Sequence, residues 1–265
     1  MRIAVFSDIH GNLEAFQACL EDARKRKPDL MVMLGDYVNG APNPKECWEL
    51  AKGEGDIVLK GNHERYLFDF NTPREMPDWQ TQWFTPMRWS ARNFTQADFD
   101  TMAALPMSWH TEECGGLEFV HSSLISDNYT PWPSLTKDDY QKHFAPSKAP
   151  YIIRGHNHIF ISFEMGGKRI DQIGSVGFPL DGRIEAEYAL LEGDPQKGWK
   201  MEPRFIPYDV ESMLARFHSS GLYDLSWMSK LYYLELQTGK PIFFSVLNPL
   251  PQEGRRGRIK PGAGL

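Results

Sequence analysis

Residues 1–15 read MRIAVFSDIHGNLEA, and this stretch sets the pattern that recurs along the chain. The apolar run at residues 3–6 predicts a β-strand, and Asp8 and His10 follow directly after it. Asn12 is a good N-cap for a helix with one apolar face. Carboxylate and imidazole are ligands that divalent metals prefer. The stretch therefore predicts a strand-loop-helix unit with candidate metal ligands in its loop.

Four further apolar runs are each followed by a polar motif of the same kind. The runs lie at 30–34, 57–59, 119–120 and 151–153, and the motifs are Gly35-Asp36, Gly61-Asn62-His63-Glu64, His121 and Gly155-His156-Asn157-His158. Because strand ends converge on one edge of an α/β sheet, we expect these side chains to meet there. The sequence predicts a two-metal hydrolytic centre at that edge.

Each motif by itself has a purely structural interpretation. A Gly-Asp pair is commonly a turn, a lone histidine such as His121 is commonly a hydrogen-bonded structural residue, and His63 could simply cap a turn. The five motifs occur in one order and each follows an apolar run, and this combination favours the metal centre.

With these motifs the chain resembles the calcineurin-like metallophosphoesterase family, whose pattern is D-x-H, G-D, G-N-H-E/D, H and G-H-x-H. The resemblance runs from residue 1 to about 194, and residues 208–211 extend it to about 241. Residues 7–15 and 174–177 are similar to the small bacterial phosphodiesterase branch of that family.

The resemblance implies a role for each motif residue. Asp8, His10 and His158 would hold one metal, Asn62, His121 and His156 would hold the other, and Asp36 would bridge the two. His63 would act on the leaving oxygen while a hydroxide shared by the metals attacks in line. The ligand types permit Mn, Fe, Zn, Co or Ni.

Two stretches depart from family subtypes. Ser/Thr protein phosphatases carry G-D-x-x-D-R-G, whereas residues 35–41 read GDYVNGA, so Asn39 replaces the second aspartate and no arginine follows. After Gly177, where the phosphodiesterase branch often has Gln and Arg, the chain reads Phe178-Pro179-Leu180. The first departure disfavours a protein-phosphatase role, and the second removes two polar groups near the rim of the site.

The order of expected elements is α/β, with two mixed β-sheets packed face to face and helices outside. We expect strands at about 2–7, 30–34, 56–59, 117–121, 150–154, 159–165, 168–173, 185–192 and 199–206, and helices from residue 12, near 44–52, at 209–219 and at 224–238. Residues 1–250 would form a single domain, with a helical insertion at 66–110, C-terminal helices at 207–240 and a flexible tail at 251–265.

The insertion is rich in aromatic residues, and two interpretations are open. Trp79, Trp83, Phe84, Trp89 and Phe94 could form a lid that stacks an aryl group or nucleobase over the metals. Alternatively, Trp79, Trp83, Met87 and Phe94 recur at a helix-like spacing and would pack on the domain. We favour packing for most of them.

Composition restricts the classes of function. The chain has 265 residues and a net charge of −6, which argues against dedicated nucleic-acid binding. It shows neither a leader segment nor an apolar run near the 18 residues of a membrane span, so we expect a cytoplasmic protein. The aromatic residues of 224–238 would pack on the domain or on another subunit, which leaves a homo-oligomer open.

Two classes of function remain. The first is a metal-dependent phosphoric ester hydrolase that acts on a nucleotide or another small phosphate ester; a dinucleoside polyphosphatase and a protein phosphatase are alternatives within it. The second is a decayed member of the same fold that serves as a binding scaffold. A decayed site should lose ligands or the catalytic histidine first, and none is lost, so we expect an enzyme.

Overall fold

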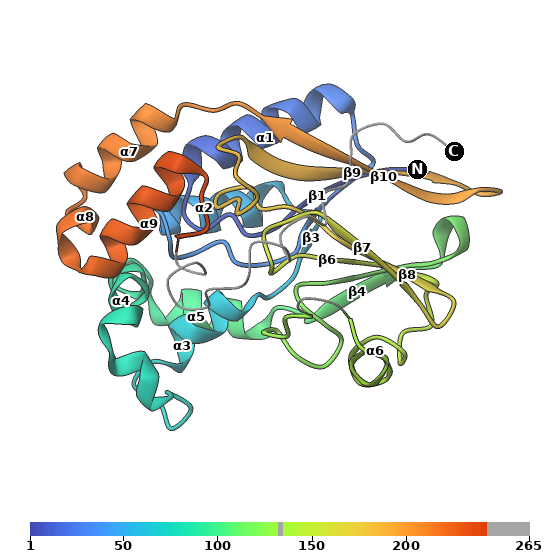
Figure 1. The fold of residues 1–265 in the computed structure, drawn as a ribbon, viewed down its shortest axis with the longest axis horizontal. Coiled ribbons are helices and arrows are strands. Elements are labelled where there is room, and N and C mark those ends of the chain that lie inside the picture. Colours follow the sequence, from blue (N-terminus) through green and yellow to red (C-terminus); the bar gives the residue numbers. More distant parts are fainter. Residues whose placement is uncertain (132–134, 243–265) are drawn as a thin grey trace.

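Two five-stranded β-sheets lie face to face at the centre of the protein (Figure 1). The computed structural model describes residues 1–131 and 135–242. The first sheet contains, in spatial order, β10 (Gly198–Ile206), β9 (Ala186–Asp194), β1 (Arg2–Phe6), β2 (Leu30–Met33) and β3 (Ile57–Val58). The second contains β4 (Ser108–Thr111), β5 (Leu117–Val120), β6 (Tyr151–Arg154), β8 (Lys168–Gln172) and β7 (Ile161–Met165).

Both sheets are mixed, as the sequence predicts. Strands β1, β2 and β3 run parallel, and β9 and β10 are antiparallel to their neighbours. In the second sheet β5, β6 and β8 run parallel, while β4 and β7 pair antiparallel at the edges. Parallel neighbours end at the same edge, so the loops after β1, β2 and β3 leave from one side of the first sheet.

Alternation along the strands builds two cores. Ile3 and Val5 of β1 face the second sheet and pack with Phe119 and Ile153. Ala4 and Phe6 point the other way, into the core beneath the helices. This period of two is what a strand buried on both faces requires.

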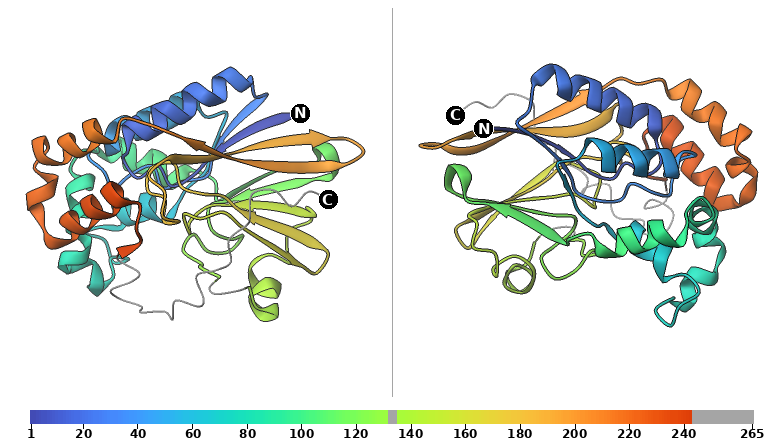
Figure 2. Two further views of the ribbon diagram at one scale, coloured as in Figure 1. Left: turned by 45° about the horizontal axis from the view of Figure 1, so that its top comes forward. Right: turned by 180° about the vertical axis from the view of Figure 1, so that it is seen from behind.

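Helices cover the outer faces of the two sheets (Figure 2). The first sheet is covered by α1 (Leu13–Arg26) and α2 (Pro44–Glu54), and Asn12 caps α1 by accepting a hydrogen bond from the Ala15 backbone N–H at 3.2 Å. On the second sheet α6 (Lys137–His143) packs through Tyr140 against Ile152 and Ile170. Asn12 therefore begins the first helix as expected, whereas α6 was not expected from the sequence.

The insertion and the C-terminal helices meet at the end of the molecule where the strand loops lie (Figure 1). The insertion follows α3 (Asn62–Asp69) and contains η1 (Pro77–Gln80), η2 (Gln82–Phe84), α4 (Thr85–Ala91) and α5 (Gln96–Ala104). The C-terminal helices are α7 (Val210–Ser219), α8 (Leu222–Leu225) and α9 (Trp227–Thr238). Helix α4 contacts both α8 and α9, so these distant parts of the sequence form one helical layer.

Three details correct the expectations from sequence. The aromatic spacing in the insertion does not mark one continuous helix, because Thr81 is extended (φ −81°, ψ 171°) and separates η1 from η2. The insertion also ends before residue 110, since β4 begins at Ser108 and pairs with β5. The helix expected at 224–238 is divided at Ser226, which is extended and caps α9 by accepting from the Ser229 backbone N–H at 3.1 Å.

Most of the insertion aromatics pack on other residues. Trp79 is buried and stacks on Phe84 at 5.5 Å between ring centroids. Trp83 meets Trp227 of α9 edge to face at 4.6 Å.

The flexible tail expected at 251–265 lies outside the described residues. Within the described part of the chain, no helix combines the length and the apolar character needed to cross a membrane.

Candidate metal centre

The loop after β1 is held in place by the loop after β2. The Asp8 backbone N–H donates to the Gly35 carbonyl at 3.0 Å, and the His10 backbone N–H donates to the Asp36 carbonyl at 2.9 Å. These bonds replace the sheet ladder beyond the strand ends and fix two candidate ligand loops relative to one another.

Left-handed backbone conformations are concentrated in these loops. Six candidate-site residues have positive φ values of 50–77°, namely Asp8, His10, Asp36, Asn39, His156 and His158. Such conformations cost free energy in residues other than glycine, although Asp, Asn and His tolerate them best. Their concentration in these loops indicates that the unfavourable backbone conformations are kept because they direct these side chains toward one another.

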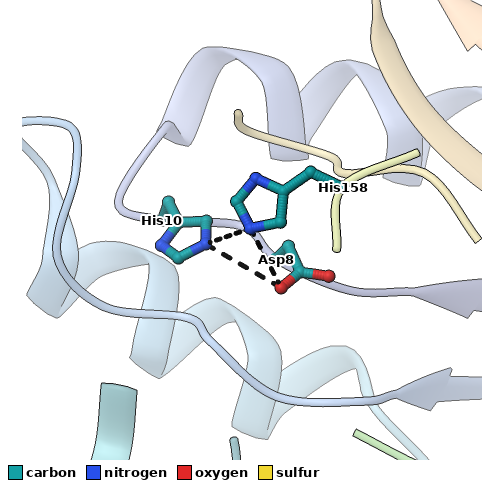
Figure 3. A group of neighbouring side chains, drawn as sticks. All are labelled: Asp8, His10 and His158. Carbon is teal, nitrogen blue, oxygen red and sulfur yellow. Dashed lines mark hydrogen bonds and ion pairs between the residues drawn. The ribbon is translucent and has the colours of Figure 1, made fainter. Parts of the chain in front are cut away.

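Asp8, His10 and His158 form the first group of candidate ligands (Figure 3). His10 Nε2 and His158 Nε2 are 3.0 Å apart, and His158 Nε2 is 3.3 Å from Asp8 Oδ1. Two ligand atoms held about 2.1 Å from one ion lie about 3.0–3.5 Å from each other. Asp8 Oδ1 is buried and has no hydrogen-bond partner, so this group fits a cation.

His158 is oriented by the loop that follows β8. Its Nδ1 lies 2.7 Å from the Phe178 backbone carbonyl, which makes Nδ1 the donor and leaves Nε2 facing Asp8. A backbone acceptor on the second ring nitrogen is the usual way in which proteins orient a metal-binding histidine.

Asp36, His121 and His156 form another group, and the Asn62 amide lies among them. Asn62 Oδ1 lies 3.0 Å from His121 Nε2. The same position of the Asn62 amide is 2.9 Å from His156 Nδ1 and 3.3 Å from Asp36 Oδ2. Atoms with lone pairs crowd together here, which favours a shared cation. His121 Nε2 is itself 3.4 Å from Asp36 Oδ2.

Asp36 connects the groups. Its Oδ2 atom is 3.4 Å from His121 Nε2 on one side and 3.9 Å from His10 Nε2 on the other. A carboxylate in this position is suited to bridge two ions.

His63 lies at the first turn of α3, beside Asp36. Its Nε2 is 3.9 Å from Asp36 Oδ2, and its ring packs edge-on against His10 at 4.6 Å. His10, Asp36 and His63 also meet the distance criteria of a ligand group, so geometry alone permits His63 to bind a metal. All eight residues predicted from the motifs are thus brought together.

In four residues of the two groups, burial and the neighbouring charges shift the side-chain pKa in opposite directions. Burial favours a neutral His121, but Asp36 raises the pKa of His121 to about 9. Burial likewise disfavours a charged His158, yet Asp8 raises its pKa. Burial favours protonated carboxyls, but the histidines hold the pKa values of both aspartates below their ordinary range. Burial lowers the pKa of the other three histidines, His10, His63 and His156.

Positive charge is therefore favoured between the carboxylates and the histidines. Metal ligands must be deprotonated, so a divalent cation would replace the protons of His121 and His158. The donor set and its charge fit divalent ions.

Glu64 is a supporting residue to which the sequence analysis gave no role. Its carboxylate accepts from the backbone N–H groups of Asp36 and Gly61, both at 2.9 Å, and of Tyr37 at 2.8 Å. It therefore joins the loop after β2 to the start of α3. The signal was present, because an acidic residue three positions after the N-cap Gly61 is typical of a capping box.

The rim beside α3 carries a tyrosine and a neutralised arginine. Tyr66 lies one turn after His63, and the centroids of the two rings are 5.6 Å apart. The Arg65 guanidinium makes a bidentate ion pair with Asp127. Its Nε donates to Asp127 Oδ2, and its Nη2 donates to Asp127 Oδ1 at 3.0 Å. Arg65 is thus already paired with a carboxylate.

Comparison with known proteins identifies the family of the chain. Residues 1–160 match the model of the calcineurin-like phosphoesterase family. The chain is similar to the uncharacterised protein MJ0912 of Methanocaldococcus jannaschii, with 27% identity over 248 residues that cover 88% of this chain and 97% of that protein. It is also similar to serine/threonine-protein phosphatase 1 of Salmonella typhimurium, with 27% identity over 112 residues, or 41% of this chain and 51% of that protein.

Two solved structures share the fold over nearly the whole chain. A metallophosphoesterase from Sphaerobacter thermophilus gives a TM-score of 0.68 at 23% identity and covers 88% of this chain and 100% of its own. The hypothetical protein PH1004 from Pyrococcus horikoshii OT3 gives 0.71 at 19% identity and covers 90% and 98%. With the family match over residues 1–160, these findings show that the chain belongs to the calcineurin-like phosphoesterase family.

Proposed function

We propose that this protein is a phosphoric ester hydrolase that binds two divalent ions and cleaves a phosphodiester of a nucleotide or another small molecule. The observation that supports it best is the position of Asp36 Oδ2, 3.4 Å from His121 of one ligand group and 3.9 Å from His10 of the other. A shared carboxylate between two groups is expected of a dinuclear centre and not of two unrelated sites.

We assign the ligands to the two ions as the family resemblance implies. Asp8, His10 and His158 would hold one ion; Asn62, His121 and His156 would hold the other, with Asp36 common to both. Bound ions of this kind supply a water of lowered pKa and positive charge for the phosphate oxygens. Mn, Fe, Zn, Co and Ni are all compatible with these donors.

His63 would act on the leaving group. It is half-buried, projects beside Asp36 from the start of α3, and its Nδ1 is engaged by Asn39 at 3.2 Å. The free Nε2 can therefore donate to the oxygen that departs from phosphorus. The same position would orient an alkoxide or a phenoxide leaving group.

The charges around the site favour a diester over a phosphomonoester dianion. Arg65 is paired with Asp127, and Arg154 is buried with its guanidinium donating to the Ser122 and Tyr129 carbonyls. Neither arginine is placed to neutralise a second negative charge on phosphate. The similarity to the Salmonella phosphatase covers half of that enzyme, and residues 35–41 of this chain lack the arginine of the protein-phosphatase motif.

The test combines metal analysis with a substrate panel. Purified protein loaded with Mn should contain close to two ions per chain and hydrolyse bis-p-nitrophenyl phosphate, while a phosphopeptide should be a poor substrate under the same conditions. Chelation should abolish hydrolysis, and added Mn should restore it. A large preference for phosphopeptide would reverse the substrate assignment. Two bound ions without turnover of any ester would favour the decayed scaffold, and full activity in metal-free protein would refute the mechanism.

A further inference from the structure

A backbone carbonyl lies among the side chains assigned to the second ion. The Oδ1 position of the Asn62 amide is 3.2 Å from the carbonyl oxygen of Asp127, in the loop after β5. From the same position, His121 Nε2 is 3.0 Å away, His156 Nδ1 is 2.9 Å away and Asp36 Oδ2 is 3.3 Å away. Four atoms that carry lone pairs therefore surround one corner of the site.

These distances fit a corner of an octahedron. When ligand atoms lie about 2.1 Å from an ion in octahedral geometry, each of them has four neighbours about 3.0 Å away. The side chains of the group supply three neighbours of Asn62, and the Asp127 carbonyl is the fourth. With Asn62 Oδ1 in this position, no N–H or O–H group within residues 1–131 and 135–242 donates to that carbonyl. Two acceptor oxygens at 3.2 Å repel one another unless a cation is shared between them.

The loop that carries Asp127 is fixed at both ends by a buried arginine. Arg154 Nε donates to the Ser122 carbonyl at 2.7 Å, and Arg154 Nη2 donates to the Tyr129 carbonyl at 2.8 Å. The Tyr129 backbone N–H also donates to Ser122 Oγ at 2.6 Å. Because Ser122 follows His121 directly, the loop both leaves and returns beside the second ligand group.

The side chain of Asp127 fixes the middle of the loop to α3. Its carboxylate accepts both contacts of the bidentate ion pair with Arg65. Asp127 is buried, whereas Ile125 and Asn128 near it in the loop are exposed, so the loop turns this one residue inward. Arg65 lies one turn after Asn62 on α3. The ion pair therefore joins the helix that begins with one candidate ligand to the loop that follows another.

We propose that the Asp127 carbonyl is a further ligand of the second ion and that the ion pair with Arg65 holds it there. This inference rests on the proposed two-ion centre. The second ion would then have five protein ligands, namely Asp36, Asn62, His121, His156 and the Asp127 carbonyl. Arg65 would be a positioning residue, because it acts on the ion only through Asp127.

Charge and geometry make opposite predictions for Arg65. A guanidinium repels a nearby cation, so its removal should tighten metal binding if only its charge matters. If Arg65 positions the Asp127 carbonyl, its removal should weaken the binding of one ion. Loss of a residue that orients a metal ligand typically lowers metal affinity by about 10–100-fold.

A crystal structure of the Mn-loaded wild type tests the ligand directly. The Asp127 carbonyl oxygen should lie within about 2.4 Å of the ion that Asn62 binds. A separation above about 3 Å, or an Asn62 amide nitrogen that donates to the carbonyl, would overturn the inference and leave the two-ion centre intact. A wild type that binds no ion at Asn62 would overturn both.

Metal titration tests the ion pair and needs no turnover. Mn is added to metal-free protein, and free Mn is measured by electron paramagnetic resonance. Arg65→Met should weaken the binding of one of the two ions by about 10–100-fold. Arg65→Lys keeps the charge but cannot make the bidentate contact, so it should also weaken that ion, by a smaller factor. Arg74→Met is the matched control, because Arg74 pairs with Asp69 at the other end of α3, and both ions should bind as in the wild type.

The direction of the change decides the role of Arg65. Weaker binding of one ion in both Arg65 variants supports positioning, whereas unchanged or tighter binding in Arg65→Met would refute it. Circular dichroism of the metal-free proteins checks that the fold is kept. If Arg65→Met does not fold, the titration of Arg65→Lys and the Mn-loaded wild-type structure decide the inference.

Discussion

Glu187→Gln should stabilise the protein, and the gain should grow as the pH rises. Glu187 lies on β9, it is fully buried, and neither oxygen of its carboxyl group has a hydrogen-bond partner. Burial, assisted by the negative charge of Asp181, raises the pKa of Glu187 to about 9. Glutamine has nearly the shape of a protonated glutamate and remains uncharged at every pH.

The magnitude follows from proton uptake on folding. The carboxyl has its ordinary pKa of 4.5 in the unfolded chain and about 9 in the folded one, so folding between these values requires it to take up a proton. Its contribution to stability is complete below pH 4.5 and is lost as the pH rises toward 9. At about 1.4 kcal/mol per pH unit, the loss at pH 7 is about 3 kcal/mol. Glutamine avoids this loss.

Urea unfolding at pH 5, 7 and 8.5 measures the effect. The free energy of unfolding of Glu187→Gln should exceed that of the wild type slightly at pH 5 and by about 3 kcal/mol at pH 7. The difference at pH 7 corresponds to an increase in Tm of roughly 6–12 °C. Glu192→Gln is the control on the same strand, because Glu192 is exposed and its gain should not grow in this way. If the free energy of unfolding of the wild type and of Glu187→Gln changed with pH in parallel, the Glu187 carboxyl would be ionised in the folded protein, and the reasoning would be wrong.

Three further variants test the metal centre. Asp36→Asn should lower metal content and activity together, because Asp36 faces both ligand groups; elemental analysis that still finds two ions would contradict its bridging role. His63→Ala should keep both ions and lose roughly 10²–10⁴-fold in turnover, less for p-nitrophenolate than for an alkoxide, whereas Asn62→Ala should weaken one metal site and recover with excess metal. An emptied metal site in His63→Ala would make that histidine a ligand. Glu64→Ala should destabilise the protein by roughly 3 kcal/mol or more in urea unfolding, since three buried backbone donors lose their acceptor; a change below about 1 kcal/mol would mean that water replaces the carboxylate.

The strand-end motifs could be predicted because they depend on local sequence. An apolar run defines where a strand ends, and parallel strands bring those ends to one edge whatever the loops contain. Asp8 after β1 and Asp36 after β2 lie together for this reason, as do His121 and His156 after the neighbouring strands β5 and β6. Their roles as ligands remain predictions.

Elements with weaker local signals were missed or misjudged. Strand β4 is four residues long and has the exposed His110 in its middle, so only its pairing with β5 identifies it. The division at Ser226 depends on a serine that could equally continue a helix, and the break between η1 and η2 at Thr81 has no breaker residue of its own. In each case tertiary packing decides between conformations that the local sequence leaves close in free energy.

The contacts of Asn39 with Ser90 and His63 show why the metal-binding part of the site is more predictable than its surroundings. Metal ligands of the types found here, Asp, Asn and His, are also the residues that best tolerate left-handed backbone, so one short motif meets both demands. Asn39 was recognised from sequence only as a departure from a phosphatase motif. Its backbone N–H donates to Ser90 of α4 at 3.2 Å, and no spacing rule relates that helix to the loop after β2. The surroundings of His63 thus include a segment of the insertion, where sequence patterns are weaker than in the strand-end motifs, and substrate preference should differ most among relatives in such segments.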